Sequence, residues 1–228
     1  MTKIQIVPVI DIKDGRAVEA KAGKRDQYRG LRSNICNSSN PLDVANAYER
    51  LGFKEVYVAD LDGILNSKPN LDLIRDISIR TGLSIMADIG IWSPDDVITL
   101  ERVKPIIATE TFSSLNMLEF PSDFILSLDT RNGELLCGMH LDLKDFMRII
   151  GDSKKINEII LLDLARVGML KGPNLRLCEY ALRELPGKNI IYGGGIRDGR
   201  DLEDLSRVGI KKVLVGSAVH SGSIFSNF

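Results

Sequence analysis

Short runs of β-branched and other apolar residues recur along the whole chain and alternate with amphipathic stretches. The runs are almost continuously apolar and do not alternate strictly with polar residues, which is typical of parallel strands that are covered on both faces. Eight strands are therefore predicted, at residues 4–10, 55–60, 83–88, 104–109, 123–129, 158–163, 189–194 and 211–216.

Capping signals between these runs predict helices. Asn40-Pro41 puts a capping side chain ahead of a proline at the first helical position, and the helix that begins here is expected to end at Gly52. Further helix boundaries are predicted at Ser93-Pro94, Gly151, Pro173 and Gly209. Eight strands that alternate with helices favour a closed (β/α)8 barrel, folded as one domain over residues 1–228, and an open doubly wound sheet is the alternative.

Internal similarity favours the closed barrel. Four pairs of segments resemble each other in the same order, namely 9–18 and 127–136, 60–74 and 163–177, 85–94 and 190–199, and 105–112 and 212–219. Chance resemblance between β/α units is the alternative explanation, which four pairs in order make less favourable. The pattern predicts a TIM barrel built from two duplicated half-barrels of four strands each.

The repeat also predicts a long loop after the first strand. The first pair of segments is separated by 118 residues and the second by 103, so the loop after strand one must be longer than the loop after strand five. This loop, residues 15–39, is rich in cations and carries Arg16, Lys21, Lys24, Arg25, Arg29 and Arg32 against Glu19 and Asp26. Because such barrels bind their ligands at the mouth where these loops lie, it is a candidate lid over an anion, with Arg16 as a possible ligand contact, or else a solvated charged loop.

Aspartates end several of the predicted strands. Asp11 and Asp129 end strands one and five, which face each other across the mouth of an eight-stranded barrel. Two carboxyl groups on opposite sides of a ligand can remove a proton from one atom and deliver one to another, whereas a single strand-end aspartate is more often a cap or a turn former. The pair is therefore the candidate acid and base, and Asp163 at the end of strand six is a possible ligand contact.

Two loops that contain glycine are candidate phosphate binders. GGGI at residues 193–196 lies between a predicted strand and a helix, and Gly216-Ser217 ends the next strand. Without Cβ atoms the backbone can approach a phosphate and direct its N–H groups towards it, and barrel enzymes often bind phosphate between the loops after strands seven and eight. Two ordinary glycine turns are the alternative. The residues predicted to bind one phosphate are Gly193, Gly194, Gly195, Gly216 and Ser217.

The matching loops of the first half lack these glycines. Asp88 stands where the second half has Gly193, and Thr109-Glu110 stands where it has Gly216-Ser217. Two carboxylates would repel a phosphate dianion, so this half is predicted to have lost phosphate binding or to use the cationic loop instead. Asp88 and Glu110 could hold a ligand hydroxyl or a metal ion, and the metal is disfavoured because no histidine lies nearby in the sequence.

Composition restricts the classes of function. The 228 residues are 44% apolar and 27% charged, which suits a globular protein with a sizeable core, and the net charge of -1 argues against a general nucleic-acid binder. Three cysteines, none of them in a CxxC pair, favour a reduced cytoplasmic chain over a disulfide scaffold. Charge interrupts the apolar run near residue 10 too early for a signal peptide, and no run is long enough to span a membrane.

Four motifs together resemble one known family. PVIDIKDGRAV, SLDTRNGE, YGGGIRD and VGSAV are similar to segments of the histidine-biosynthesis sugar isomerases (ProFAR isomerases) and of their relative, the cyclase subunit of imidazole glycerol phosphate synthase. SLDTRNGE is more similar to the isomerase, whereas DIKDGRAV is shared with the cyclase. The resemblance implies an Amadori-type aldose–ketose rearrangement of a phosphorylated aminosugar without a cofactor. It also implies Asp11 as general base, Asp129 as general acid, and one phosphate held by the two glycine loops.

The sequence departs from that family in two places. The family has a glycine cluster in both halves and a substrate with two phosphates, whereas the first half here reads ADIGI. The family also has a threonine and an aspartate around strand six, where this chain has Leu162, Val167 and Met169. The chain is therefore predicted to be a divergent isomerase that binds a small sugar phosphate with one phosphate group, and neither nucleic acid nor a membrane. The alternatives are a cyclase or lyase with a glutaminase partner, and a non-catalytic protein that binds a phosphorylated metabolite.

Overall fold

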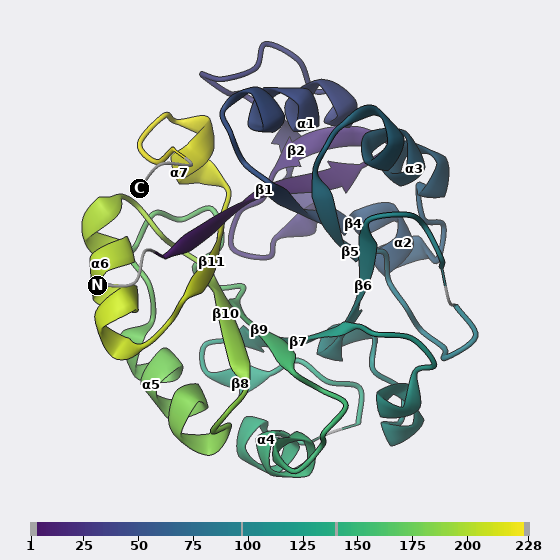
Figure 1. The fold of residues 1–228 in the computed structure, drawn as a ribbon, viewed down its shortest axis with the longest axis vertical. Helices are drawn as coiled ribbons and strands as arrows, with labels where there is room; N and C mark the ends of the chain where they lie inside the picture. The colour runs from purple at the N-terminus through teal and green to yellow at the C-terminus, as the bar shows by residue number, and fades with distance from the viewer. Residues whose placement is uncertain (1–3, 97, 140, 226–228) are drawn as a thin grey trace.

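The computed structural model describes residues 4–96, 98–139 and 141–225, and in it the strands close into a barrel (Figure 1). The parallel strands of the barrel are β1 (Gln5–Lys13), β4 (Glu55–Asp60), β5 (Ser84–Asp88), β6 (Val103–Ala108), β7 (Ile125–Arg131), β9 (Glu158–Asp163), β10 (Asn189–Gly193) and β11 (Lys212–Val215). β1 pairs with β4 on one side and with β11 on the other, which closes the sheet on itself. The predicted TIM barrel is confirmed, and the open sheet is excluded.

Helices surround the strands (Figure 1). They are α1 (Pro41–Arg50), α2 (Leu61–Asn66), α3 (Leu71–Arg80), α4 (Leu143–Gly151), α5 (Leu175–Glu184), α6 (Gly199–Val208) and α7 (Ser217–His220). Short elements extend the loops, namely the strands β2 (Arg16–Glu19), β3 (Arg29–Gly30) and β8 (Glu134–Leu135) and the 3-10 helices η1 (Arg25–Gln27), η2 (Thr109–Thr111) and η3 (Leu115–Glu119).

Several helix boundaries follow the capping signals of the sequence. α1 begins as predicted, because the Asn40 side chain accepts a hydrogen bond from the N–H of Leu42. α6 ends as predicted before Gly209, whose φ of 107° is a left-handed value that glycine adopts without strain. α5 begins two residues after Pro173, because Asn174 is the residue that caps it.

The helix expected to begin at Ser93-Pro94 is absent from the described part of this segment, residues 89–96 and 98–102. Among the described residues between β5 and β6, the chain makes a turn in which the Asp96 carboxylate accepts hydrogen bonds from the N–H groups of Trp92 at 2.9 Å and Ser93 at 2.8 Å. This side chain satisfies, within a loop, donors that a helix start would leave free. The prediction was wrong because it considered only Ser93 and Pro94. It did not consider that the nearby Asp96 carboxylate could bind the backbone N–H groups first.

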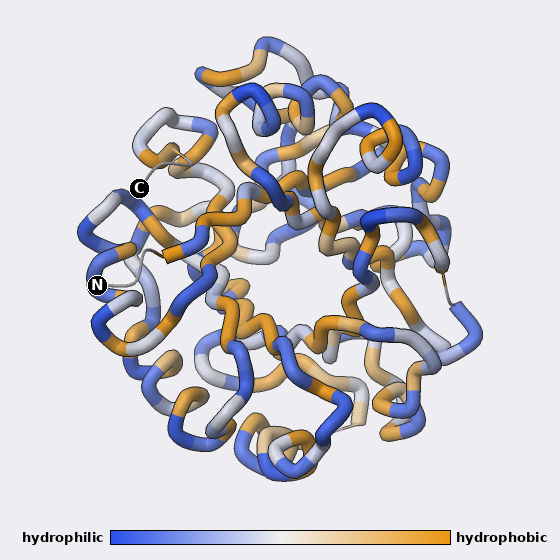
Figure 2. Tube along the Cα trace, viewed as in Figure 1, coloured by the Kyte–Doolittle hydropathy of each residue, from blue (hydrophilic) through white to orange (hydrophobic). Residues whose placement is uncertain are grey.

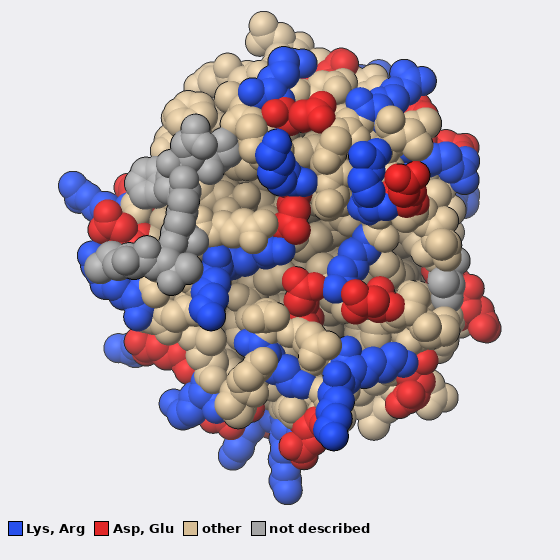
Figure 3. Space-filling model, viewed as in Figure 1, with Lys and Arg blue, Asp and Glu red and all other residues tan. Residues whose placement is uncertain are grey.

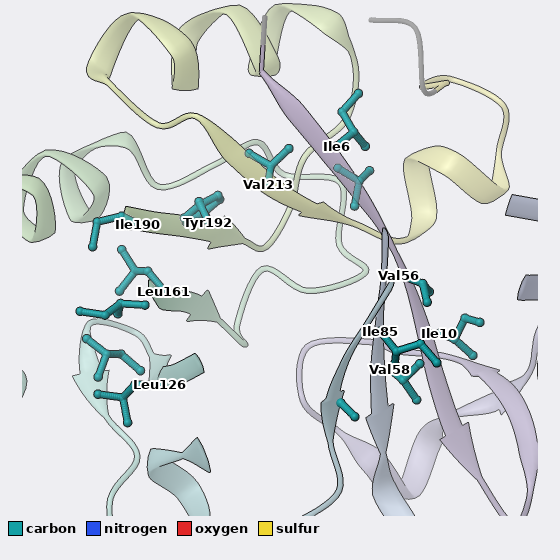
Figure 4. Close-up of a cluster of buried hydrophobic side chains, with 14 of the residues drawn as sticks. Ile6, Ile10, Val56, Val58, Ile85, Leu126, Leu161, Ile190, Tyr192 and Val213 are labelled. Atoms are coloured by element: carbon teal, nitrogen blue, oxygen red, sulfur yellow. The ribbon is translucent and has the colours of Figure 1, made fainter. Parts of the chain in front are cut away.

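Alternating strand residues build two separate parts of the core. One set fills the barrel interior with Val7, Tyr57, Met86, Ile106, Ile125, Ile160, Ile191 and Leu214, so that every barrel strand contributes. Their neighbours along the strands, which include Ile6, Val56 and Ile85, pack with helix residues in a larger cluster. Figure 4 shows strand members of this cluster. Because side chains alternate between the faces of a strand, both faces are apolar, and the strands are mostly hydrophobic in Figure 2.

The end of the barrel at which the strands begin carries ion pairs. Figures 1 and 3 look onto this end, and basic and acidic side chains meet near its centre. Lys104 at the start of β6 contacts Glu158 at 2.6 Å and Asp123 at 2.8 Å. Lys212 at the start of β11 contacts Glu55 at 2.8 Å. A ligand site is therefore expected at the other end, where the strands stop.

The cysteines form no disulfide. Cys178 is buried in α5, and Cys36 and Cys137 are partly exposed. Within the parts of the chain that the structure describes, no helix combines the length and the apolar character needed to cross a membrane.

Candidate active site

A cavity of about 1020 Å³ opens at the end of the barrel where the strands stop. Its wall combines the ends of β1, β4, β5, β9, β10 and β11 with much of the segment between β1 and α1. TIM barrels carry their ligand sites at this end, because the loops that follow the strands can vary without disturbing the barrel. The cavity is therefore the candidate active site.

Three acidic residues point into the barrel at one level. Asp11 is in register with Ala59 on the neighbouring strand β4, and Ala59 is in register with Asp88 on β5. Asp129 lies on β7, in register with Leu162 on β9. Because side chains alternate along a strand, all three carboxyl groups lie above the apolar residues that fill the barrel interior.

Asp11 reaches the cavity directly. Its side chain lines the wall, and none of the described residues donates a hydrogen bond to its carboxyl group. Loss of hydration deep in the mouth raises the pKa of Asp11 to about 7, an effect that the positive charge of Arg25 partly offsets. A carboxyl group that ionises near neutrality can accept a proton and release it again, so Asp11 suits the predicted role of general base.

Asp129 lies just behind the cavity wall. Its carboxyl group accepts hydrogen bonds from the hydroxyl of Ser127 at 2.8 Å and from the N–H of Glu110 at 3.4 Å, and only 1% of the residue is exposed. Burial, Glu110 and Asp88 raise the pKa of Asp129 well above its ordinary value, which favours the protonated form that a general acid requires. It is Glu110, however, that lines the cavity at this point.

An ion pair joins the loop after β1 to the acidic side of the mouth. Arg25 contacts Glu110 at 2.5 Å, and the C=O of Arg25 accepts a hydrogen bond from Nζ of Lys13 at 2.8 Å. Asp88 lies beside this pair, and burial together with Glu110 raises the pKa of Asp88 to about 7. Sequence reasoning does not single out Arg25 from the other cations of the loop, because its partner lies 85 residues away. In the described residues, no group of three or more His, Cys, Asp or Glu is arranged to hold a metal ion.

The predicted phosphate binders lie together on the wall across from Asp88. Gly194 and Gly195 have φ values of 133° and 77°, and a Cβ atom on Gly195 would lie 2.6 Å from the C=O oxygen of Gly172. Only glycine fits that position without a shift of the backbone. Among the described residues, the N–H groups of Gly195, Gly216 and Ser217 have no hydrogen-bond acceptor. These donors are therefore free to bind an anion.

The segment between β1 and α1 folds over the mouth. β2 and β3 extend it as antiparallel strands beside β1. Further along, the N–H of Ala22 donates to the C=O of Val167 at 2.8 Å. Gly168 permits this contact, because a Cβ atom there would lie 1.8 Å from the C=O oxygen of Ala20. The long loop is present as predicted, and it rests on the loop after β9.

Two predicted ligand contacts do not line the cavity. Arg16 is exposed at the start of β2. Asp163 is buried, and its carboxyl group accepts a hydrogen bond at 3.3 Å from the side chain of Asn174. Asn174 is the residue that caps α5. Asp60 makes the equivalent contact with Asn70 at 2.8 Å in the first half. This repeated pair of aspartates therefore links the strands to the helices that follow them.

The chain is similar to known proteins along almost its whole length. Residues 5–225 match the family described as histidine biosynthesis protein. The chain belongs to this family. The resemblance inferred from the four sequence motifs is thereby confirmed.

Within the histidine biosynthesis protein family, the similar proteins differ in what is known of them. The chain is 38% identical over 225 residues to an uncharacterized protein of Methanocaldococcus jannaschii, with 96% of this chain and 94% of the relative covered. It is 30% identical over 239 residues to an imidazole-4-carboxamide isomerase of Lactococcus lactis subsp. lactis, covering 97% and 96%. It is 28% identical over 235 residues to the isomerase of the same name from Acetivibrio thermocellus, covering 96% and 95%. The full name of these isomerases contains two phosphoribosyl groups.

Proposed function

We propose that this chain is an isomerase that moves a proton within a phosphorylated aminosugar by acid–base chemistry. The observation that carries the proposal is that Asp11, with a pKa of about 7, lines the same cavity as the free N–H groups of the glycine loops. A phosphate held by those loops would fix one end of the substrate and bring a carbon atom to Asp11. The isomerase names of relatives in the same family support this class of reaction.

The rearrangement requires an acid as well as a base. Asp129 would protonate the ring oxygen as its bond to C1 breaks, and Asp11 would remove the proton from C2 to give an enol. Return of a proton from Asp11 to C1, with loss of the enol proton to Asp129, would complete the ketose and restore both groups. Because Asp129 lies behind Glu110, its proton can reach the ligand only when the Arg25–Glu110 pair shifts. Arg25 belongs to the loop over the mouth, which can move on ligand entry without disturbing the barrel strands.

We assign one phosphate to the substrate rather than two. Asp88 and Glu110 line the side of the cavity that faces the glycine loops, and two carboxyl groups there would repel a phosphate dianion. The substrate of this chain is therefore expected to differ at one end from a compound with two phosphoribosyl groups.

Turnover of three compounds tests the proposal. The substrate of the isomerase relatives would be compared with two analogues, each of which lacks one of the terminal phosphates. We expect one of these analogues to be isomerised faster than the parent compound, and Asp11→Asn and Asp129→Asn each to lower kcat by about 100-fold or more. Asp72→Asn, at an exposed position of α3, is the control. Unchanged rates in both active-site variants would contradict the acid–base assignment and favour a non-catalytic phosphate-binding protein.

A further inference from the structure

The half of the mouth formed by β4, β5 and β6 contains polar groups that the proposed proton transfer does not use. Asp88 and Glu110 line the cavity on the side that faces the glycine loops. Tyr57 lies below them in the barrel interior and lines the same cavity. We refer to these three side chains as the acidic subsite.

The hydroxyl of Tyr57 has no hydrogen-bond partner among the described residues, although only 4% of the residue is exposed. It points inward from β4, between the strands that carry Asp11 and Asp88. Burial, followed by the charges of Asp88 and Asp129, raises the pKa of Tyr57 well above its usual range, so the hydroxyl keeps its proton. The hydroxyl oxygen is not sealed off from the cavity, so a ligand bound there can supply its hydrogen-bond partner.

Backbone donors that could bind phosphate in the other half are already occupied in this half. The N–H of Glu110 corresponds in the repeat to the N–H of Ser217. The N–H of Glu110 donates a hydrogen bond to the Asp129 carboxyl group at 3.4 Å. The N–H of Gly90 corresponds to that of Gly195, and it donates to the carboxylate two residues before it at 3.2 Å. The acidic subsite therefore presents acceptors where an anion would need donors.

We propose that the acidic subsite binds a primary ammonium group at the end of the substrate opposite its phosphate, so that the substrate is a phosphorylated amine. An ammonium group has three N–H donors and no acceptor, which matches the carboxyl oxygens of Asp88 and Glu110 and the hydroxyl oxygen of Tyr57. A metal ion fits less well, because the described residues contain no cluster of three or more ligands placed to hold one. This inference rests on the proposed phosphate site and extends it to the other end of the substrate.

The charges around the subsite favour a cation over a neutral hydroxyl group. The side chains whose charges act most strongly on Tyr57 are acidic, namely Asp88, Asp129, Asp11 and Glu110. Arg25 is already paired with Glu110. Burial and the repulsion from Glu110 raise the pKa of Asp88 to about 7, and an ammonium group would relieve this repulsion whereas a hydroxyl group would not.

Calorimetric titration of the full chain with matched ligands tests this inference. The ligands are alkyl phosphates of increasing length, the same compounds with a terminal amine, and the same compounds with a second phosphate. At the best length, we expect the amine to bind at least about tenfold more tightly than the plain alkyl phosphate, as for a charge-assisted hydrogen bond in a desolvated site. Asp88→Asn and Tyr57→Phe should each remove most of this difference and leave binding of the plain compound in place. Asp72→Asn should change neither affinity.

The outcomes separate failure of the inference from failure of the phosphate site. Equal affinity for the amine and the plain compound, or tightest binding of the bisphosphate, would overturn the inference and leave the phosphate site standing. A preference for the amine that persists in both Asp88→Asn and Tyr57→Phe would also overturn it, because the amine would then bind elsewhere. Binding of none of the compounds would overturn the phosphate site and the inference with it.

Discussion

At the scale of single residues, Asp88 distinguishes two half-barrels that otherwise resemble each other. It holds on β5 the inward position that Gly193 holds on β10. Together with Asp11 and Asp129 it forms a layer of carboxyl groups whose pKa values are all raised. Ionising such groups inside a barrel opposes folding, so we infer that function rather than stability accounts for them.

A pH-dependent gain in stability is expected for Asp88→Asn. The folded protein holds a proton on Asp88 up to about pH 7, whereas the unfolded chain releases it near pH 4, so the free energy of unfolding falls as the pH rises between these values. The variant removes this loss and should be more stable than the parent by up to a few kcal/mol at about pH 8, with a smaller difference at about pH 5. Urea unfolding at the two pH values measures this. An equal difference in the free energy of unfolding at the two pH values would contradict the raised pKa of Asp88. The same pH dependence in Asp72→Asn would contradict it too.

The residues of the site differ in how far the sequence could predict them. Alternation along strands that are buried on both faces is enough to place Asp11 and Asp88 inward. The same rule places Tyr57 inward, although no motif in the sequence marks Tyr57 as part of a site. The rule cannot show that Asp129 lies behind Glu110 or that Arg25 pairs with Glu110, because these contacts depend on how two loops fold against each other.

At the scale of elements, the segment between β1 and α1 is the part that links the two sides of the mouth. It contacts Glu110 through Arg25 and the loop after β9 through Ala22. The C=O of Val167 accepts the N–H of Ala22, so the loop over the mouth is held at this point.

Gly168→Ala is expected to release this loop. A Cβ atom would lie 1.8 Å from the C=O oxygen of Ala20, so the two loops must separate. We expect cleavage within residues 15–39 by a non-specific protease to become about tenfold faster or more, and alkyl phosphates to bind more weakly. Gly133→Ala is the matched control, because Gly133 also has a positive φ of 86° but nothing lies within 4 Å of its added Cβ atom. Equal cleavage rates in the two variants would show that the contact does not hold the loop.

At the scale of the whole molecule, the duplicated barrel gives a mouth whose two sides differ in charge. Continuous apolar runs predicted all eight barrel strands, because each strand must bury both faces. The helix expected at Ser93-Pro94 is not found in the described residues, because the Asp96 carboxylate binds the backbone there instead. Glycine loops with free N–H groups form one side of the mouth, carboxyl groups form the other, and Asp11 lies between them. The proposed function depends on this arrangement.

The crystal structure of the protein soaked with inorganic phosphate tests this arrangement most directly. We predict one anion, held by the N–H groups of Gly195, Gly216 and Ser217, and no anion beside Asp88. A phosphate bound beside Asp88 and Glu110, or empty glycine loops at a phosphate concentration that saturates binding in solution, would contradict the account.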